Sequence, residues 1–118
     1  MIVAIVGSRE FNDFPQFCKY MDEFRKVLEI DQIVSGGAKG ADEMAYRYSI
    51  ARGITFVCHP PIPEDGFPRM YFMRNIRIAN HCEFMIAFPK GASTGTRHAI
   101  KSTQNLGKKV LVVEIKDT

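Results

Sequence analysis

The chain of 118 residues carries a formal net charge of +3, and 46% of its residues are hydrophobic and 25% charged. This length and composition predict one globular domain over residues 1–118 with an ordinary hydrophobic core. No apolar run approaches the roughly 18 residues of a membrane-spanning helix, and the mild basic excess suits an anionic small ligand without requiring nucleic acid.

The start of the chain and its cysteines indicate a cytoplasmic protein without membrane contact. Residues 1–6 enter a strand directly and have no basic flank, so we do not interpret them as a signal peptide. The cysteines, Cys18, Cys58 and Cys82, are odd in number and widely spaced. Without an export signal, we interpret them as reduced, buried thiols.

The first half of the chain alternates strand and helix. Residues 2–6 form a continuous β-branched run, which predicts a strand buried on both faces of a parallel sheet. Asn12 or Asp13 can cap a helix with Pro15 in its first turn, and apolar residues at helical spacing extend it to about Leu28. A second strand over 32–35 and a second helix over 41–52 follow, and Gly53 ends that helix.

The second half continues this alternation after a proline-rich interruption. Residues 54–58 predict a third strand, and three prolines in residues 59–66 predict an extended surface segment without regular structure. The remaining elements are a helix over 70–81, a strand over 84–88, a helix over 97–106 and a strand over 110–115. Alternating strands and helices specify right-handed crossovers. We therefore predict an α/β fold: a Rossmann-like, doubly wound three-layer sandwich whose five-stranded parallel sheet has the order 3-2-1-4-5.

Three loops rich in small residues follow the first, second and fourth strands, at residues 7–9, 35–40 and 91–96. Because ligands bind outside the carboxyl ends of parallel strands, these loops predict one shared site near the switch point. Glycine-rich turns let backbone N–H groups converge on an anion, and the following helix adds its positive end. For the loop at 35–40 alone, a tight strand-to-helix turn is the alternative. No standard P-loop or dinucleotide motif is present, which disfavours P-loop hydrolysis and simple NAD binding.

The motifs together resemble the YspA-type branch of the SLOG superfamily, in order and over essentially the whole chain. They are Val6-Gly7-Ser8-Arg9, Ser35-Gly36-Gly37-Ala38-Lys39-Gly40-Ala41-Asp42, Arg74-Asn75 and Gly91-x-Ser93-x-Gly95-Thr96. The superfamily also contains the DNA-processing protein Smf/DprA and the LONELY GUY cytokinin-activating phosphoribohydrolases. The resemblance implies a Rossmann-like fold that binds nucleotides, nucleotide-derived molecules or, in the DprA branch, single-stranded DNA.

The sequence departs from the phosphoribohydrolase motif P-G-G-x-G-T-x-x-E, because the glutamate position falls on Ala99. Arg74 matches the arginine that works with this glutamate at the ribose, so half of the catalytic pair is missing. Without a carboxylate there is no evident general base or oxocarbenium stabiliser. Glu10 or Asp42 could substitute only in a suitable geometry. We therefore expect binding rather than hydrolysis, with Arg74 as the catalytic candidate if the protein is an enzyme.

Each candidate ligand-binding residue has a structural alternative. Arg9 could clamp an anion or pair with a neighbouring carboxylate, and Phe11 could stack on a base or pack beneath the next helix. Lys39 could bind phosphate or lie in solvent, and Asp42 could favour the helix dipole or accept a ribose hydroxyl. The candidates are Gly7, Ser8, Arg9, Phe11, Ser35, Gly36, Gly37, Lys39, Gly40, Asp42, Arg74, Asn75, Gly91, Ser93, Gly95 and Thr96.

The leading hypothesis is a nucleotide-binding protein that senses or sequesters a nucleotide-derived small molecule. Phosphates would rest on the loops at 35–40 and 91–96, with Arg9, Lys39 and Arg74 supplying positive charge. A phosphoribohydrolase-like enzyme that cleaves the base–ribose bond of a nucleoside monophosphate is one alternative. Single-stranded DNA binding is another, disfavoured because the basic excess is modest and no aromatic-basic stripe is evident.

We expect no cofactor and no metal. The pairs Cys58-His59 and His81-Cys82 lack zinc-motif spacing, and His98 is interpreted as an ordinary surface histidine. The helix over residues 70–82, rich in Met and Phe, could serve a homodimer interface or pack in the core. Base recognition would depend on walls contributed by loops such as 59–68.

Overall fold

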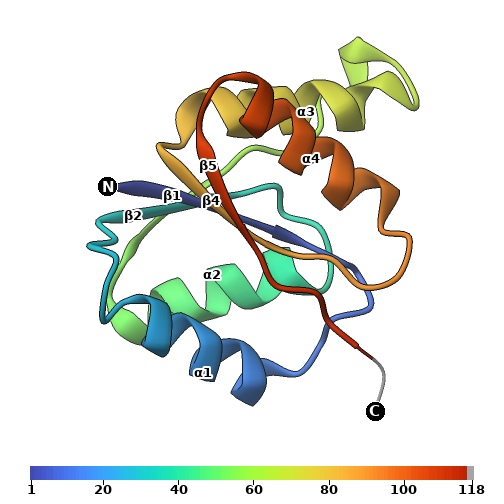
Figure 1. Ribbon diagram of the computed structural model, residues 1–118. Helices are drawn as coiled ribbons and strands as arrows, with labels where there is room; N and C mark the ends of the chain where they lie inside the picture. Colours follow the sequence, from blue (N-terminus) through green and yellow to red (C-terminus); the bar gives the residue numbers. More distant parts are fainter. Residues whose placement is uncertain (117–118) are drawn as a thin grey trace.

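Five parallel strands form a single sheet of order β3-β2-β1-β4-β5 in the computed structural model, which describes residues 1–116 (Figure 1). They are β1 (Ile2–Gly7), β2 (Gln32–Ser35), β3 (Thr55–Cys58), β4 (Phe84–Phe88) and β5 (Lys109–Val112). The central strand β1 pairs with both β2 and β4, so that Ala4 faces Val34 on one side and Met85 on the other. The predicted fold class and strand order are confirmed.

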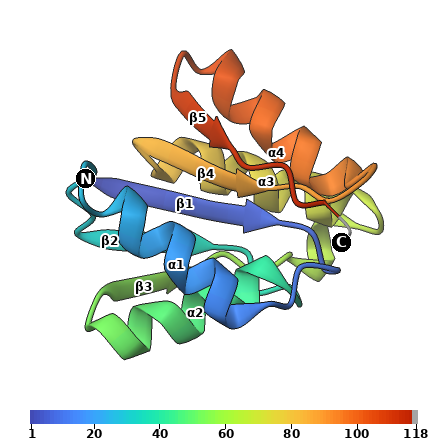
Figure 2. The same cartoon turned by 60° about the horizontal axis from the view of Figure 1, so that its bottom comes forward.

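Four helices cover the sheet, two on each face, as Figures 1 and 2 show. Helices α1 (Phe14–Phe24) and α2 (Ala41–Arg52) lie on one face, and α3 (Arg69–His81) and α4 (Thr94–Asn105) lie on the other. Alternate residues of a strand point to opposite faces. Val3 and Ile5 accordingly belong to the core beneath α1 and α2, whereas Ala4 and Val6 belong to the core beneath α3 and α4. Burial on both faces explains the unbroken apolar run of β1.

Several predicted boundaries are wrong. Helix α1 ends at Phe24 and not near Leu28, because the backbone N–H groups of Lys26 and Val27 bond to carbonyls three residues back, in a tightened final turn. Helix α4 begins at Thr94, three residues before the predicted start, so part of the predicted loop 91–96 is helical. Strand β5 is shorter than predicted, although Ile115 still bridges to Lys90.

The proline-rich segment after β3 also differs from its prediction. Residues 59–66 contain one turn of 3₁₀ helix, η1 (Pro63–Asp65), which begins at a proline. Proline suits this first position, because its fixed φ is pre-organised and its missing N–H has no partner to lose. The three cysteines are free, as predicted, but Cys58 is exposed and Cys18 half-buried, so the expectation of buried thiols holds for Cys82 alone.

Close packing between two loops positions the edge of the sheet where the strands end. Gly40, at the start of α2, has φ 78° and ψ −127°. A Cβ atom there would overlap the carbonyl oxygen of Ser8 and lie 2.7 Å from Cα of Arg9. The N–H of Ala41 donates to the same Ser8 carbonyl at 3.3 Å. The loop after β1 therefore rests directly on the backbone that enters α2.

We expect Gly40→Ala to lower the free energy of unfolding by about 3 kcal/mol, because it combines backbone strain with a steric clash. The matched control is Gly53→Ala at the end of α2, where φ is also positive, 68°, but nothing lies within 4 Å of the added Cβ. We expect that control to cost about 1 kcal/mol. Urea unfolding of both variants measures the difference. Equal losses would show that the loop yields to the new methyl group.

Candidate functional site

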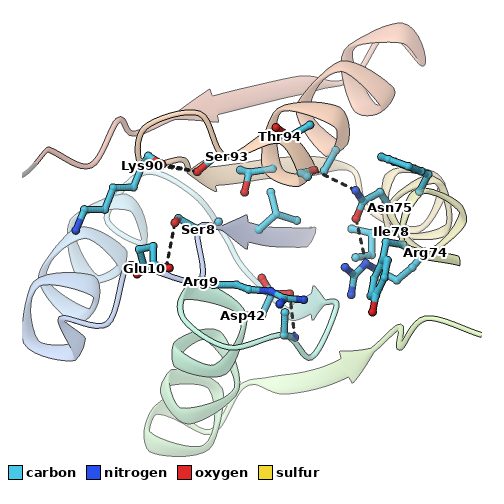
Figure 3. A pocket seen from close by; sticks show the side chains of 18 of the residues that line it. Ser8, Arg9, Glu10, Asp42, Arg74, Asn75, Ile78, Lys90, Ser93 and Thr94 are labelled. Atoms are coloured by element: carbon cyan, nitrogen blue, oxygen red, sulfur yellow. Dashed lines mark hydrogen bonds between the residues drawn. The ribbon is translucent and has the colours of Figure 1, made fainter. Parts of the chain in front are cut away.

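A cavity of ≈ 490 Å³ opens where β1 and β4 end (Figure 3). Its walls come from the loop after β1, the loop before α2, the first turn of α4 and the inner face of α3. The volume falls within the range of small-molecule sites, and the position is the switch point of the sheet. The lining residues are Val6, Gly7, Ser8, Arg9, Glu10, Ala38, Asp42, Pro68, Tyr71, Phe72, Arg74, Asn75, Ile78, Lys90, Ser93, Thr94, Gly95, Thr96 and Ala99.

The structure divides the candidates into two groups. The residues that line the cavity are Gly7, Ser8, Arg9, Asp42, Arg74, Asn75, Ser93, Gly95 and Thr96. The residues outside its lining are Phe11, Ser35, Gly36, Gly37, Lys39, Gly40 and Gly91. The loop at 35–40 accounts for most of the second group, and its geometry gives the reason.

The loop before α2 is already filled by a carboxylate of the protein. Asp42 is 6% exposed, and its Oδ2 accepts a hydrogen bond from the backbone N–H of Ala38 at 3.3 Å. Burial raises the pKa of Asp42, while the charge of Arg74 and the amides of Ala38 and Gly36 oppose that rise. An amide that bonds to Asp42 is not available to an external phosphate. The expectation that a phosphate rests on the loop at 35–40 therefore does not fit this geometry.

Three other candidates have structural roles. The hydroxyl of Ser35 is buried and donates to the carbonyl of Ile5 at 2.6 Å. A Cβ on Gly36 would overlap the guanidinium of Arg74. The ring of Phe11 is 2% exposed and packs against Phe88 with 5.5 Å between ring centroids, so it cannot stack on a ligand.

Lys39 points to a different hollow. Lys39 lines a second cavity of ≈ 440 Å³, together with Tyr46, Phe56 and Cys58 among others. Lys39 does not belong to the lining of the cavity at the switch point. The expectation that it supplies charge to a phosphate there is not met by its position.

The first turn of α4 faces the cavity without a side-chain cap. Ser93 occupies the N-cap position with φ 41°, but its hydroxyl donates to the carbonyl of Lys90 at 2.7 Å and accepts from the N–H of Lys90 at 2.9 Å. Within residues 1–116, no side chain caps the N–H groups of Thr94, Gly95 and Thr96. Uncapped N–H groups at a helix start, together with the helix dipole, attract anions.

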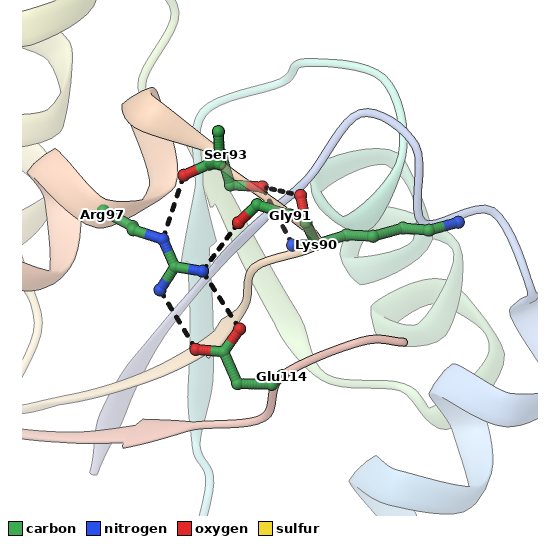
Figure 4. Close-up of polar contacts among 6 residues, drawn as sticks. Lys90, Gly91, Ser93, Arg97 and Glu114 are labelled. Atoms are coloured by element: carbon green, nitrogen blue, oxygen red, sulfur yellow. Dashed lines mark hydrogen bonds and ion pairs between the residues drawn. The ribbon is translucent and has the colours of Figure 1, made fainter. Parts of the chain in front are cut away.

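Arg97 braces the turn that leads into α4, as Figure 4 shows. Its guanidinium donates to the carbonyls of Gly91 at 2.8 Å and Ala92 at 3.0 Å. The same group makes two bonds to the carboxylate of Glu114, at 3.0 and 3.1 Å. Gly91, with φ 64°, is therefore part of a fixed turn behind the cavity rather than part of its lining.

A hydrogen-bond network on α3 connects the two halves of the cavity wall. Nη1 of Arg74 donates to the carbonyl of Gly36 at 2.8 Å, and its Nε donates to Oδ1 of Asn75 at 3.0 Å. The amide of Asn75 donates to the carbonyl of Gly95 at 3.1 Å and lies 3.2 Å from Nδ1 of His98. Burial lowers the pKa of His98, which favours the neutral ring that accepts this bond. His98 is thus half-buried and part of the network. The prediction from sequence that it is an ordinary surface histidine is wrong.

Ten lining residues are outside the set of candidates that the sequence suggested, and they are Val6, Glu10, Ala38, Pro68, Tyr71, Phe72, Ile78, Lys90, Thr94 and Ala99. Tyr71 precedes Arg74 by three positions, so helical spacing alone would place both on one face. Phe72 packs edge-on against His98, with 4.8 Å between ring centroids. These rings give the cavity an aromatic side opposite its polar loops.

Arg9 contributes a positive charge to the lining of the cavity. Its side chain is exposed, and within residues 1–116 no carboxylate forms an ion pair with it. The expected alternative, a salt bridge to Glu10 or Asp13, is therefore not formed. Figure 3 shows Arg9 reaching along the cavity from the loop after β1. The described residues 1–116 contain no cluster of three His, Cys, Asp or Glu side chains that could hold a metal ion, and no helix among them is long and apolar enough to span a membrane.

The segment after β3, whose Pro68 lines the cavity, is tied to α3 at two points. Nε2 of His59 lies 2.7 Å from Nδ1 of His81, and Asp65 forms an ion pair of 2.7 Å with Arg77. Burial lowers the pKa of His59, and His81 and Arg77 lower it further. This wall is therefore held at one of its two points by a histidine whose pKa lies below its ordinary value.

Comparisons with known proteins show the family and the fold of this chain. Residues 1–62 match a protein-family model described as the YspA, cpYpsA-related SLOG family. The chain is 30% identical over 116 residues to the Gene 61 protein of Mycobacterium phage D29, and the match covers 92% of this chain and 93% of that protein.

The structure is similar to the X-ray structure of DNA processing protein A (DprA) from Streptococcus pneumoniae, with a TM-score of 0.73 and 22% identity. The similarity covers 93% of this chain and 49% of the DprA chain, so this chain spans about half of that protein. At this level of identity, the likeness shows the fold.

We expect the free energy of unfolding to fall with acidification, in part through His59. Its folded pKa lies below the ordinary value of 6.5, so the unfolded chain binds the proton more readily. This contribution is intact above the ordinary pKa and is lost as the pH falls through it toward the folded pKa. Denaturant unfolding between about pH 8 and pH 5 should therefore show a steeper decline for the wild type than for His59→Gln. His98 remains in both proteins and supplies the slope they share. Identical slopes would contradict this assignment.

Proposed function

The chain belongs to the YspA, cpYpsA-related SLOG family, and from its cavity we propose that it binds a nucleotide or nucleotide-derived phosphorylated ligand. The phosphate would lie against the first turn of α4, where uncapped N–H groups and the helix dipole favour an anion. Arg9 would add a mobile positive charge from the opposite loop. The protein would then sense or sequester this ligand.

Gly95 is the observation that carries this proposal. It lies in the first turn of α4 without a positive φ, and nothing lies within 4 Å of a Cβ built on it. Neither backbone conformation nor protein packing accounts for a glycine there, and glycine in a helix costs about 1 kcal/mol relative to alanine. The space in front of Gly95 belongs to the cavity. A ligand that approaches the backbone closely accounts for the missing side chain.

The rest of the cavity suits the remainder of a nucleotide. Tyr71 and Phe72 offer flat apolar surface on the α3 side, and aromatic rings stack readily on bases. The amides and hydroxyls of the polar loops lie on the other side. A mixed aromatic and polar lining of ≈ 490 Å³ supports a ligand with both a base and a phosphate.

A phosphoribohydrolase-like activity is the second candidate, and the placement of two carboxyl groups supports testing it. Ala99 presents only a methyl group to the cavity, but Asp42 and Glu10 both belong to its lining. Burial raises the pKa of Asp42, as in many general acids and bases. Release of free base from a nucleoside monophosphate, abolished by Arg74→Ala, would establish this activity.

Single-stranded DNA binding is the third candidate, supported by the likeness to DNA processing protein A (DprA). It would show as binding that weakens steeply with salt, because phosphate contacts release counterions. Nucleotide binding to one phosphate site would depend on salt far less.

We expect Gly95→Ala to stabilise the fold by up to about 1 kcal/mol and to weaken ligand binding by about tenfold or more. The added methyl group improves helix propensity but occupies the space of the phosphate. Ser102→Ala is the matched control, because it also improves the propensity of α4 but lies outside the cavity lining. Calorimetric titration with mono-, di- and cyclic nucleotides and ADP-ribose, together with urea unfolding, measures both effects.

Two outcomes would contradict the proposal. One is the absence of saturable binding to any member of this panel by the wild-type protein. The other is binding that Gly95→Ala and Ser102→Ala leave equally unchanged. The gain in stability shows that any loss of binding by Gly95→Ala does not come from unfolding.

A further inference from the structure

We infer that the site selects a ligand with a single terminal phosphate, and that Asp42 is the residue that excludes a second phosphate group. This inference rests on the proposed function and specifies its ligand. The edge of the sheet offers two helix starts at glycine-containing turns, those of α2 and α4. The protein keeps the turn before α4 open toward the cavity and fills the turn before α2 with its own carboxyl group.

The carboxyl group of Asp42 stands where an external anion would otherwise bind. Its Oδ2 accepts from the N–H of Ala38, and it is 6% exposed. Even when protonated, the group occupies the position and keeps the amide bonded. When ionised, it also repels a neighbouring phosphate. Both forms therefore leave one anion position in the cavity.

Neighbouring contacts hold Asp42 in place. Gly40 is packed against Ser8, which fixes the start of α2 two residues before Asp42. The guanidinium of Arg74, whose charge acts on Asp42, directs its Nη1 to the carbonyl of Gly36 and its Nε to Asn75. The positive charge of Arg74 opposes the rise in the pKa of Asp42. Its Nη1 and Nε are already bonded to the protein and are therefore not free to bind a second phosphate.

The two anion positions lie on opposite sides of one cavity. Figure 3 shows Asp42 on the α2 side and Thr94 on the α4 side. A second phosphate group would lie among Asp42, Glu10 and Arg9, which all belong to the lining. The two carboxyl groups outnumber the one guanidinium, which the phosphate on the α4 turn already engages. Specificity by repulsion of the wrong ligand is a common device in binding sites.

The test compares nucleoside 5′-monophosphates with the matching 5′-diphosphates, and inorganic phosphate with pyrophosphate, by calorimetric titration. We expect the wild-type protein to favour each monophosphate over its diphosphate by about tenfold. Asp42→Asn should reduce this preference, because the amide oxygen can still accept from Ala38 while the negative charge is lost and N–H donors are gained.

Glu43→Gln is the matched control. It removes the same charge one residue further along α2, from an exposed side chain outside the lining of this cavity. It should keep the wild-type preference, which separates a local effect of Asp42 from a change in net charge. The wild-type comparison needs no variant, so it remains decisive if Asp42→Asn does not fold.

Equal or tighter binding of diphosphates by the wild-type protein would overturn the inference. If that binding were still weakened by Gly95→Ala, the proposed function would stand and only the exclusion by Asp42 would be wrong. If none of these probes bound, the proposed function would fail and the inference with it. A loss of preference in Glu43→Gln equal to that in Asp42→Asn would also overturn the role of Asp42.

Discussion

The contact between Gly40 and the carbonyl of Ser8 sets the arrangement of the whole sheet edge. Two loops from adjacent strands can approach this closely only because Gly40 has no side chain and adopts a backbone conformation that other residues avoid. The contact places Asp42 in the first turn of α2, against the amide of Ala38. Asp42 in turn determines which of the two glycine-containing turns remains open. The packing of Gly40 against Ser8 and the bond from Ala38 to Asp42 thus fix the α2 side of the cavity.

Glycine serves different purposes at this edge, and the surroundings of each one distinguish them. Gly7 and Gly40 allow backbone segments to pack closely, and Gly36 leaves room for the guanidinium of Arg74. Protein atoms fill the space beside all three. Gly95 differs because the space beside it is empty and its φ is not positive. An unexplained absence of a side chain at a helix start is a sign of a ligand, whereas glycine richness as such is not.

This difference also explains how far the sequence could be interpreted. Apolar runs such as that of β1 and the alternation of strands with helices determine the topology, because burial on both faces leaves a clear pattern. The topology predicted that the loops after β1, β2 and β4 meet at one edge of the sheet, where the structure has a cavity. The role of the loop at 35–40 did not follow, because a run of glycines does not reveal whether an internal carboxylate such as Asp42 already accepts its N–H bonds. Tyr71 and Phe72 were missed because an aromatic residue on a helix is indistinguishable from core without the cavity beside it.

The network through Arg74 and Asn75 bears on the choice between binding and catalysis. Two nitrogens of Arg74 are bonded to the protein, at the carbonyl of Gly36 and at Asn75, and Asn75 is bonded to the carbonyl of Gly95. The arginine therefore joins the α2 loop to the start of α4, and its geometry is fixed before any ligand arrives. A wall held in this way loses little conformational entropy when a ligand binds, which favours affinity. Catalysis at a ribose would require a carboxylate free to act on the reacting atoms; Asp42 is held by a backbone amide and Ala99 presents only a methyl group, which leaves Glu10 as the other carboxyl group of the lining. The same bonds thus hold the α2 loop and the start of α4 in one fixed geometry.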